Sequence, residues 1–242
     1  MITRQIKWLL AVAVLATVGS VHGALLEWNF DGIPSNVGYD NQPSPTVTAE
    51  PGFSTSGLSR GDGIGRSGAR TMGKAWGGSN FLYTKDQALA ADVCFYLDII
   101  IAPEVIVSLT SIQTPWCGSP LQSPESGQWQ YSLDAGTTGW NDVGGEYVLP
   151  HGSYDVITLD LTGETALSEI SGVTVTFRLL LWGGEDGTSG RFSFGTGTTS
   201  GPATPWGNSL IINGDVVPEP SAAALLVLSG VALLLRRKKM RH

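Results

Sequence analysis

The sequence predicts an all-β protein, an antiparallel β-sandwich of the jelly-roll type, flanked by a short hydrophobic helix at each end of the chain. Many short β-branched or aromatic runs are separated by turn-forming residues, with 32 glycines and 13 prolines among 242 residues. No amphipathic helix of ten or more residues stands between these runs, so nothing would carry the chain from one parallel strand to the next. An antiparallel sandwich therefore fits best.

Two runs alternate as strands with one buried face do. In Val93 to Ile101 the apolar residues Phe95, Leu97 and Ile99 alternate with more polar neighbours, and Val173 to Trp182 follows the same period of two. The full set of expected strands is Leu25 to Phe30, Asn80 to Tyr83, Val93 to Ile101, Val105 to Ser111, Gln128 to Leu133, Tyr154 to Leu161, Val173 to Trp182, Arg191 to Phe194 and Leu210 to Val216.

The first 23 residues read as a signal peptide. Arg4 and Lys7 precede an eleven-residue apolar run from Trp8 to Val18, and small residues then lead to an expected cut between Gly23 and Ala24. A lasting membrane span needs roughly 20 apolar residues, so this run is too short for one. We expect export by the Sec pathway, with signal peptidase as a partner during maturation.

The C-terminus carries a second short apolar segment, from Ser221 to Leu235. As a helix, fifteen residues reach about 22 Å, which suits a brief stay in a membrane. A motif before it and a basic cluster after it complete the pattern: Val217, Pro218, Glu219 and Pro220, then Arg236, Arg237, Lys238, Lys239 and Arg241. The basic cluster is expected to stay cytoplasmic.

This order of V-P-E-P-S, short helix and R-R-K-K resembles the PEP-CTERM sorting signal of Gram-negative bacteria, which the membrane protease exosortase recognises. The resemblance implies a cut near Pro218 to Pro220, followed by passage to the outer envelope, cell surface or extracellular matrix. An ordinary tail anchor is the alternative. The chain then divides into a signal peptide (1–23), an exported domain (24–216) and a sorting signal (217–242).

The resemblance extends into the exported domain. The opening L-L-E-W-N-F-D-G, the run G-V-T-V-T-F-R-L-L-L-W-G-G and the closing L-I-I-N-G are similar to segments of the β-sandwich domains of many PEP-CTERM proteins. Those domains usually read D-N-L before the last strand, whereas this chain has Gly207, Asn208 and Ser209 there. The likeness implies a fold and a location rather than an activity.

The exported part is strongly acidic. Of the 14 basic residues, two lie in the signal peptide and five in the tail, which leaves seven against 21 acidic residues and a formal charge of −14 for residues 24–219. Because nucleic-acid binding needs clustered lysine and arginine, nucleic acid is excluded as a partner.

Cys94 and Cys117 are the only cysteines, and both belong to the exported part. An oxidising compartment would let them form a disulfide. The alternative is that Cys94 is a small buried apolar residue on its strand.

Catalytic motifs are missing from the exported part. His151 is its only histidine and stands in a turn, and no nucleophile elbow, zinc-binding helix or phosphate loop accompanies it. We therefore expect a non-enzymatic structural or adhesive protein that contacts extracellular polysaccharide. The alternative is a secreted carbohydrate-active enzyme, a glycoside hydrolase or lyase, whose acids the pattern does not reveal.

Two kinds of ligand site are weakly indicated. Asp62, Glu185 and Asp186 lie in glycine-rich turns that could bind calcium, but neither stretch matches a spaced D-x-D-x-D-G loop, so ordinary turns are favoured and no cofactor is expected. Trp76 and Trp206 also lie in turns, where an exposed indole could stack on a sugar ring. Packing at the ends of the core is the alternative for these rings.

Overall fold

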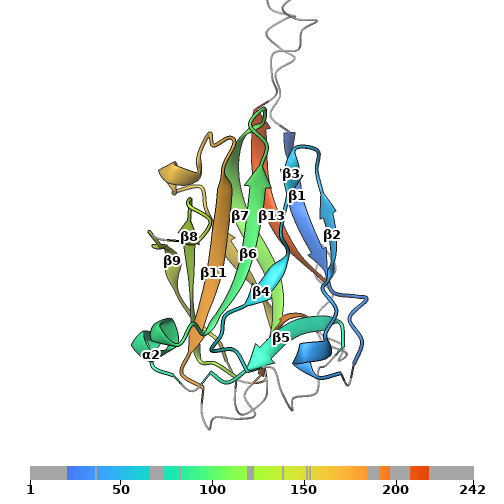
Figure 1. Cartoon of the computed structure of the whole chain (residues 1–242), viewed down its shortest axis with the longest axis vertical. Helices are drawn as coiled ribbons and strands as arrows, with labels where there is room; N and C mark the ends of the chain where they lie inside the picture. The colour runs from blue at the N-terminus through green and yellow to red at the C-terminus, as the bar shows by residue number, and fades with distance from the viewer. Residues whose placement is uncertain are drawn as a thin grey trace, which may run out of the picture.

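Two antiparallel sheets form the molecule (Figure 1). The computed structural model describes residues 21–35, 37–65, 73–81, 83–118, 123–137, 139–150, 152, 154–184, 191–196 and 208–217. Sheet A contains β1 (Val21–Asn29), β2 (Thr46–Ala49), β5 (Ala75–Ser79), β7 (Ile106–Gly118), β10 (Tyr154–Asp160), β12 (Arg191–Gly195) and β13 (Ser209–Val217). Sheet B contains β3 (Phe53–Ser54), β4 (Leu58–Arg60), β6 (Cys94–Ile101), β8 (Ser126–Ser132), β9 (Asn141–Val148) and β11 (Thr174–Trp182). The predicted β-sandwich is confirmed.

The strand order brings distant parts of the chain together. Sheet A runs β2-β1-β13-β7-β12-β5, with β10 also paired to β7, and sheet B runs β3-β6-β11-β8-β9, with β4 also paired to β6. Helical structure in the described ranges is limited to short pieces: η1 (Tyr39–Asn41), α2 (Lys85–Ala90) and η2 (Thr165–Leu167). Thr84 and Gln87 form a capping box that starts α2.

A cluster of aromatic rings joins the sheets. The ring centroid of Phe95 in sheet B lies 5.2 Å from that of Phe194, 5.8 Å from Phe192 and 5.7 Å from Trp76, all three in sheet A. All four residues are buried. Because successive side chains of a strand point to opposite faces, Cys94 and Tyr96 face outward beside the inward Phe95.

The sequence placed one strand wrongly. Asn80 to Tyr83 was expected to be a strand, but β5 ends at Ser79, and Asn80 has a φ of 76°, in the left-handed region. Strand β5 instead contains Gly77, where an added Cβ would lie 2.1 Å from the carbonyl oxygen of Phe192. The close approach of β5 to β12 thus requires glycine, a residue with low strand propensity.

The hypothesised disulfide between Cys94 and Cys117 is wrong, because the structure has both as free, buried thiols. Cys94 lies in sheet B and Cys117 in sheet A, and each is adjacent in sequence to an inward-packed ring, Phe95 or Trp116. The two thiols therefore point away from each other on the outer sides of the sandwich. Burial raises the pKa of each thiol to about 12, so both stay protonated at neutral pH.

The two ends of the described chain leave the sandwich at the same end (Figure 1). Val21 of β1 pairs with Val216 of β13, and Gly23 pairs with Gly214. The predicted signal-peptide cut after Gly23 falls inside this ladder, so it would remove the first three residues of β1. The apolar core of the leader and the sorting segment after Val217 lie outside the described residues. No helix within the described ranges is long and apolar enough to span a membrane.

Candidate functional site

A row of polar side chains crosses the outer face of sheet B. Cross-strand register places Ser59 opposite Tyr96, Tyr96 opposite Arg178, Arg178 opposite Gln130, and Gln130 opposite Asp142. These residues come from five different strands, and strands lie about 4.8 Å apart, so the row is about 19 Å long. The outer face of this sheet therefore presents a continuous polar strip.

Hydrogen bonds fix the centre of the row. Arg178 Nε donates to Gln130 Oε1 at 2.6 Å, and Gln130 Nε2 donates to Asp142 Oδ1 at 2.6 Å. Only 9 % of Arg178 is exposed, and the described residues offer its guanidinium no carboxylate within salt-bridge distance. A buried charge needs compensation, which the Gln130 amide and a neighbouring indole supply.

That indole belongs to Trp140, in the loop between β8 and β9. The Arg178 Cζ lies 4.0 Å from the centroid of the Trp140 ring, and the Tyr96 ring centroid lies 5.9 Å away. Positive φ angles at Ala135 and Gly136 turn the loop back toward the sheet, and a Cβ at Gly136 would lie 3.1 Å from the indole. Trp140 is half-buried, so part of its ring remains available to a ligand.

Tyr96 keeps its phenol neutral. Burial raises the pKa of Tyr96, and the hydrogen bond from its hydroxyl to Asp92 Oδ1 raises it further. The hydroxyl is therefore committed to Asp92, and the ring is the part of Tyr96 that can contact a ligand beside Trp140.

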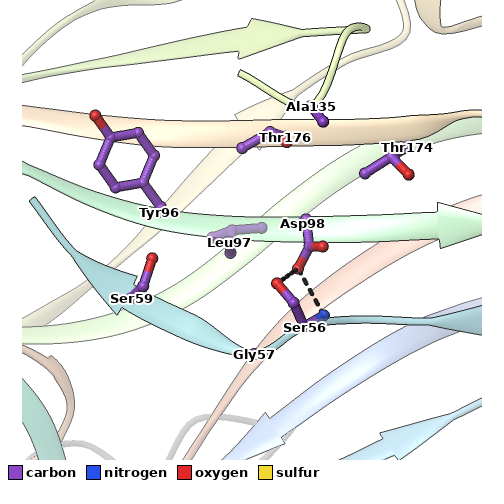
Figure 2. A pocket seen from close by; sticks show the side chains of 9 residues that line it. All are labelled: Ser56, Gly57, Ser59, Tyr96, Leu97, Asp98, Ala135, Thr174 and Thr176. Carbon is purple, nitrogen blue, oxygen red and sulfur yellow. Dashed lines mark hydrogen bonds between the residues drawn. The ribbon is translucent and has the colours of Figure 1, made fainter. Parts of the chain in front are cut away.

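A second row contains Asp98, which is 8 % exposed. Its Oδ1 accepts three hydrogen bonds, from Thr55 Oγ1 at 2.8 Å, Ser56 N at 2.9 Å and Ser56 Oγ at 2.9 Å; Figure 2 shows the two from Ser56. These bonds tie the segment between β3 and β4 to β6. Its Oδ2 has no hydrogen-bond donor among the residues that the structure describes, so one oxygen of a nearly buried carboxylate is free to accept.

An open pocket of about 310 Å³ lies between this segment and the β8–β9 loop (Figure 2). Its lining includes the hydroxyls of Ser56, Ser59, Thr174 and Thr176, the carboxylate of Asp98 and the ring of Tyr96. Its volume lies at the lower end of the range for small-molecule sites, about 300 to 1,000 Å³. Convergent hydroxyls, one carboxylate and the ring of Tyr96 suit a polyhydroxylated ligand.

Trp76, one of the two expected sugar platforms, is not exposed. Only 3 % of Trp76 is accessible, and its ring lies between Phe95 and the guanidinium of Arg60, whose Cζ is 3.9 Å from the ring centroid. Arg60 Nε also donates to the carbonyl oxygen of Gly77 at 2.7 Å, which closes the edge between β4 and β5. Trp76 is a core residue, and the prediction was wrong. Trp206 lies outside the described residues.

The calcium candidates gain no support from their surroundings. Asp62 is exposed, and its backbone N–H donates to Asp92 Oδ2 at 3.1 Å. Across the described ranges, no group of three or more histidine, cysteine or acidic side chains could hold a metal ion. Glu185, Asp186 and His151 lie outside those ranges, as do Pro218, Glu219, Pro220 and the basic cluster that ends the chain.

Part of the pocket lining belongs to the polar half of the two alternating runs, namely Tyr96, Asp98, Thr174 and Thr176. Tyr96 and Asp98 alternate with Phe95 and Leu97, so the pattern already assigned them to an outer face. The pairing of β11 with β6 on one side and β8 on the other, which brings Arg178 and Gln130 into the same row as Tyr96, is not encoded in any local pattern. No local pattern indicates that Trp140 folds back onto the sheet either.

No family model and no curated protein matches the chain. Among solved structures it is similar to the xylan-binding domain CBM22-1 of Xyn10C from Paenibacillus barcinonensis, with 9 % identity, a TM-score of 0.36, and coverage of 83 % of this chain and 99 % of that one. A carbohydrate-binding module specific for non-crystalline cellulose, CBM28, gives 10 % identity, a TM-score of 0.34, and coverage of 59 % and 83 %. A chitosan-binding module from Paenibacillus sp. IK-5 gives 13 % identity, a TM-score of 0.22, and coverage of 69 % and 93 %.

Proposed function

We propose that this chain is an exported, non-catalytic protein of the cell envelope or extracellular matrix that binds polysaccharide on the outer face of sheet B. The observation that carries the proposal is a pocket that combines the free Asp98 Oδ2 with the ring of Tyr96, beside which the Trp140 ring lies at a centroid distance of 5.9 Å. Sugars offer hydroxyls to a carboxylate and an apolar ring face to an aromatic side chain. Both interactions are available within this pocket.

The charge pattern of the pocket favours binding over cleavage. Glycoside hydrolysis generally needs two carboxyl groups on either side of the scissile bond. Among the described residues that line the pocket, Asp98 is the one carboxylate. A saccharide held there would be bound without the acid and base pair that bond cleavage requires.

We expect Trp140→Ala to weaken retention of polysaccharide by at least about tenfold, or 1.4 kcal/mol. The full-length chain in mild detergent would be run by affinity electrophoresis through gels containing xylan, mixed-linkage β-glucan or galactomannan. Trp182→Ala is the matched control, because Trp182 is also half-buried, but its ring lies 5.2 Å from Lys85 Nζ instead of beside the pocket residue Tyr96.

Equal losses in the two tryptophan variants, or retention by none of the polysaccharides, would refute binding at this face. The same incubations would be assayed for new reducing ends. If new reducing ends appear with the unmodified chain and are lost in Asp98→Asn, the chain is a carbohydrate-active enzyme and the binding proposal is wrong.

Export and sorting complete the proposal. The motif from Val217 to Pro220 and the short apolar segments at both termini support processing by signal peptidase and exosortase. Since Val21 of β1 pairs with Val216 of β13, the two ends of the described chain lie at the same end of the sandwich.

Intact-mass spectrometry of the protein from its native host tests this processing. We expect a chain that begins at Ala24 and ends near Pro218 to Pro220, with or without an attached lipid or sugar. Recovery of the complete 242-residue chain from the inner membrane at steady state would contradict it.

A further inference from the structure

A second cavity opens beside the pocket, at an edge of the sandwich. This edge cleft has a volume of about 360 Å³ and lies between β2 of sheet A and the segment from Ser54 to Leu58 of sheet B. Val47 and Ala49 of β2 line one side. Ser56 and Gly57 line both the edge cleft and the pocket on sheet B, so the two cavities adjoin across this short segment.

Asp98 holds that shared segment in place. Its Oδ1 accepts hydrogen bonds from Thr55 and Ser56, and Thr55 Oγ1 in turn accepts from Gly57 N at 3.0 Å. The boundary between the two cavities is therefore a fixed ridge, built by the same carboxylate that lines the pocket.

Trp28 of β1 lines the edge cleft and carries an unsatisfied donor. The residue is fully buried, and Trp28 Nε1 is one of two buried side-chain polar atoms that lack a hydrogen-bond partner in the described part of the chain. A buried donor without an acceptor costs about 1 to 3 kcal/mol. Because the nitrogen is covered, an oxygen atom from a ligand in the cleft relieves that cost only when the side chains around the indole shift.

The lining of the edge cleft selects for an uncharged ligand. Pro45, Val47 and Leu58 offer apolar surface, and Ser44 and Ser54 offer hydroxyls, while the described lining contains no ionisable side chain. A carboxylate or ammonium group entering this cleft would lose hydration without gaining a partner of opposite charge. A neutral sugar unit has the matching mixture of apolar ring faces and hydroxyls.

We propose that the pocket on sheet B and the edge cleft are two subsites for one neutral polysaccharide, which crosses the ridge from Thr55 to Gly57. The inference rests on the saccharide-binding function proposed above and adds the ligand class and the second subsite. A sugar oxygen in the edge cleft accepts from Trp28 Nε1 after the side chains that cover the indole have shifted, while Asp98 and Trp140 hold the units on sheet B.

The test compares short and long neutral oligosaccharides on the full-length chain. Xylo-, cello- and manno-oligosaccharides of two and six units would be titrated by calorimetry, with oligogalacturonate and oligoalginate as anionic probes. We expect a six-unit neutral chain to bind at least about tenfold more tightly than the two-unit chain, and the anionic probes to bind no better than the two-unit chain.

Two neighbouring residues of β2 give a matched pair of variants. Val47→Tyr fills the mouth of the edge cleft, because Val47 lines it and is 39 % exposed. Thr48→Tyr places the same side chain on the other face of the strand, where an exposed residue does not line the cleft. We expect Val47→Tyr to remove the advantage of the long chain and leave two-unit binding unchanged, and Thr48→Tyr to change neither. Thermal melts of both variants would serve as the control for folding.

Binding that responds to Trp140→Ala but not to Val47→Tyr would overturn the second subsite and leave the proposed function standing. Equal affinity for long and short chains, or tighter binding of the anionic probes, would overturn it as well. Failure of every probe to bind the unmodified chain would overturn both proposals. Trp28→Phe, which keeps most of the ring and removes the N–H, should weaken long-chain binding several-fold.

Discussion

Phe95→Ala should lower the free energy of unfolding by about 3 to 5 kcal/mol, the usual cost of removing a large aromatic side chain from a core. Phe95 is fully buried, and its ring centroid lies within 6.4 Å of those of Trp76, Phe81, Phe192 and Phe194. Three of these rings, Trp76, Phe192 and Phe194, belong to sheet A, so Phe95 joins the two sheets at this end. Its removal leaves a cavity that neighbouring rings cannot fill without leaving their own contacts.

Urea denaturation of the full-length chain, followed by near-ultraviolet circular dichroism, measures this loss. Leu89→Ala serves as the control, because Leu89 is 45 % exposed on α2 and a surface change of this kind costs about 0.5 kcal/mol or less. A loss below about 1.5 kcal/mol for Phe95→Ala would mean that the sheets are held together elsewhere.

The fold class could be predicted because burial of one face imposes a period of two on the sequence. Phe95, Leu97 and Ile99 are all buried in β6, as their alternation indicated, and Val175 and Phe177 behave likewise in β11. Each run shows this period by itself, so the strand could be predicted without knowing which strands it pairs with. The ends of the strands were less certain, and β7 extends to Gly118, beyond the run expected there.

The strands that lack an alternating buried face were not predicted. Every residue of β2 is exposed, and β9 has only Val143 buried, because both are edge strands. In β5 the backbone lies so close to β12 that a side chain would not fit at Gly77. Glycine therefore stands where a β-branched residue would have marked a strand. Edge position and backbone proximity are properties of the assembled sheets, and local composition does not record them.

Only part of the candidate site could be predicted, because alternation shows which side chains face outward but not which of them meet. The outward position of Asp98 follows from alternation, but its hydrogen bonds to Thr55 and Ser56 join residues more than forty positions apart. The sequence suggested Trp76 as a ligand platform and did not single out Trp140, because the exposure of each ring depends on which segment folds inward. Trp76 is covered by Arg60, whereas Trp140 is held on the surface by Arg178, and these contacts arise only from tertiary packing.

Asp98→Ala is expected to abolish measurable polysaccharide retention and to lower the free energy of unfolding by about 3 kcal/mol. The substitution removes an acceptor of three hydrogen bonds at a site that is 8 % exposed, which leaves the Thr55 and Ser56 donors without a partner. It also removes the free oxygen that faces the ligand. Affinity electrophoresis and urea denaturation on the same preparation measure the two effects. Asp160→Ala, which loses a similar pair of bonds from Thr162 at an exposed turn, should change neither.

Asp98→Asn separates the two roles of this carboxylate. An asparagine can turn its carbonyl oxygen toward Thr55 and Ser56, so the ridge keeps its acceptor and most of the stability should return. Its amide group then replaces Oδ2 with a donor, and a hydroxyl that donated to the carboxylate loses its partner. We therefore expect a folded variant whose affinity stays at least about tenfold below that of the unmodified chain. Restored stability together with restored affinity would show that Asp98 shapes the ridge without touching the sugar, and the ligand contacts would have to be sought at Trp140 and the threonines of β11.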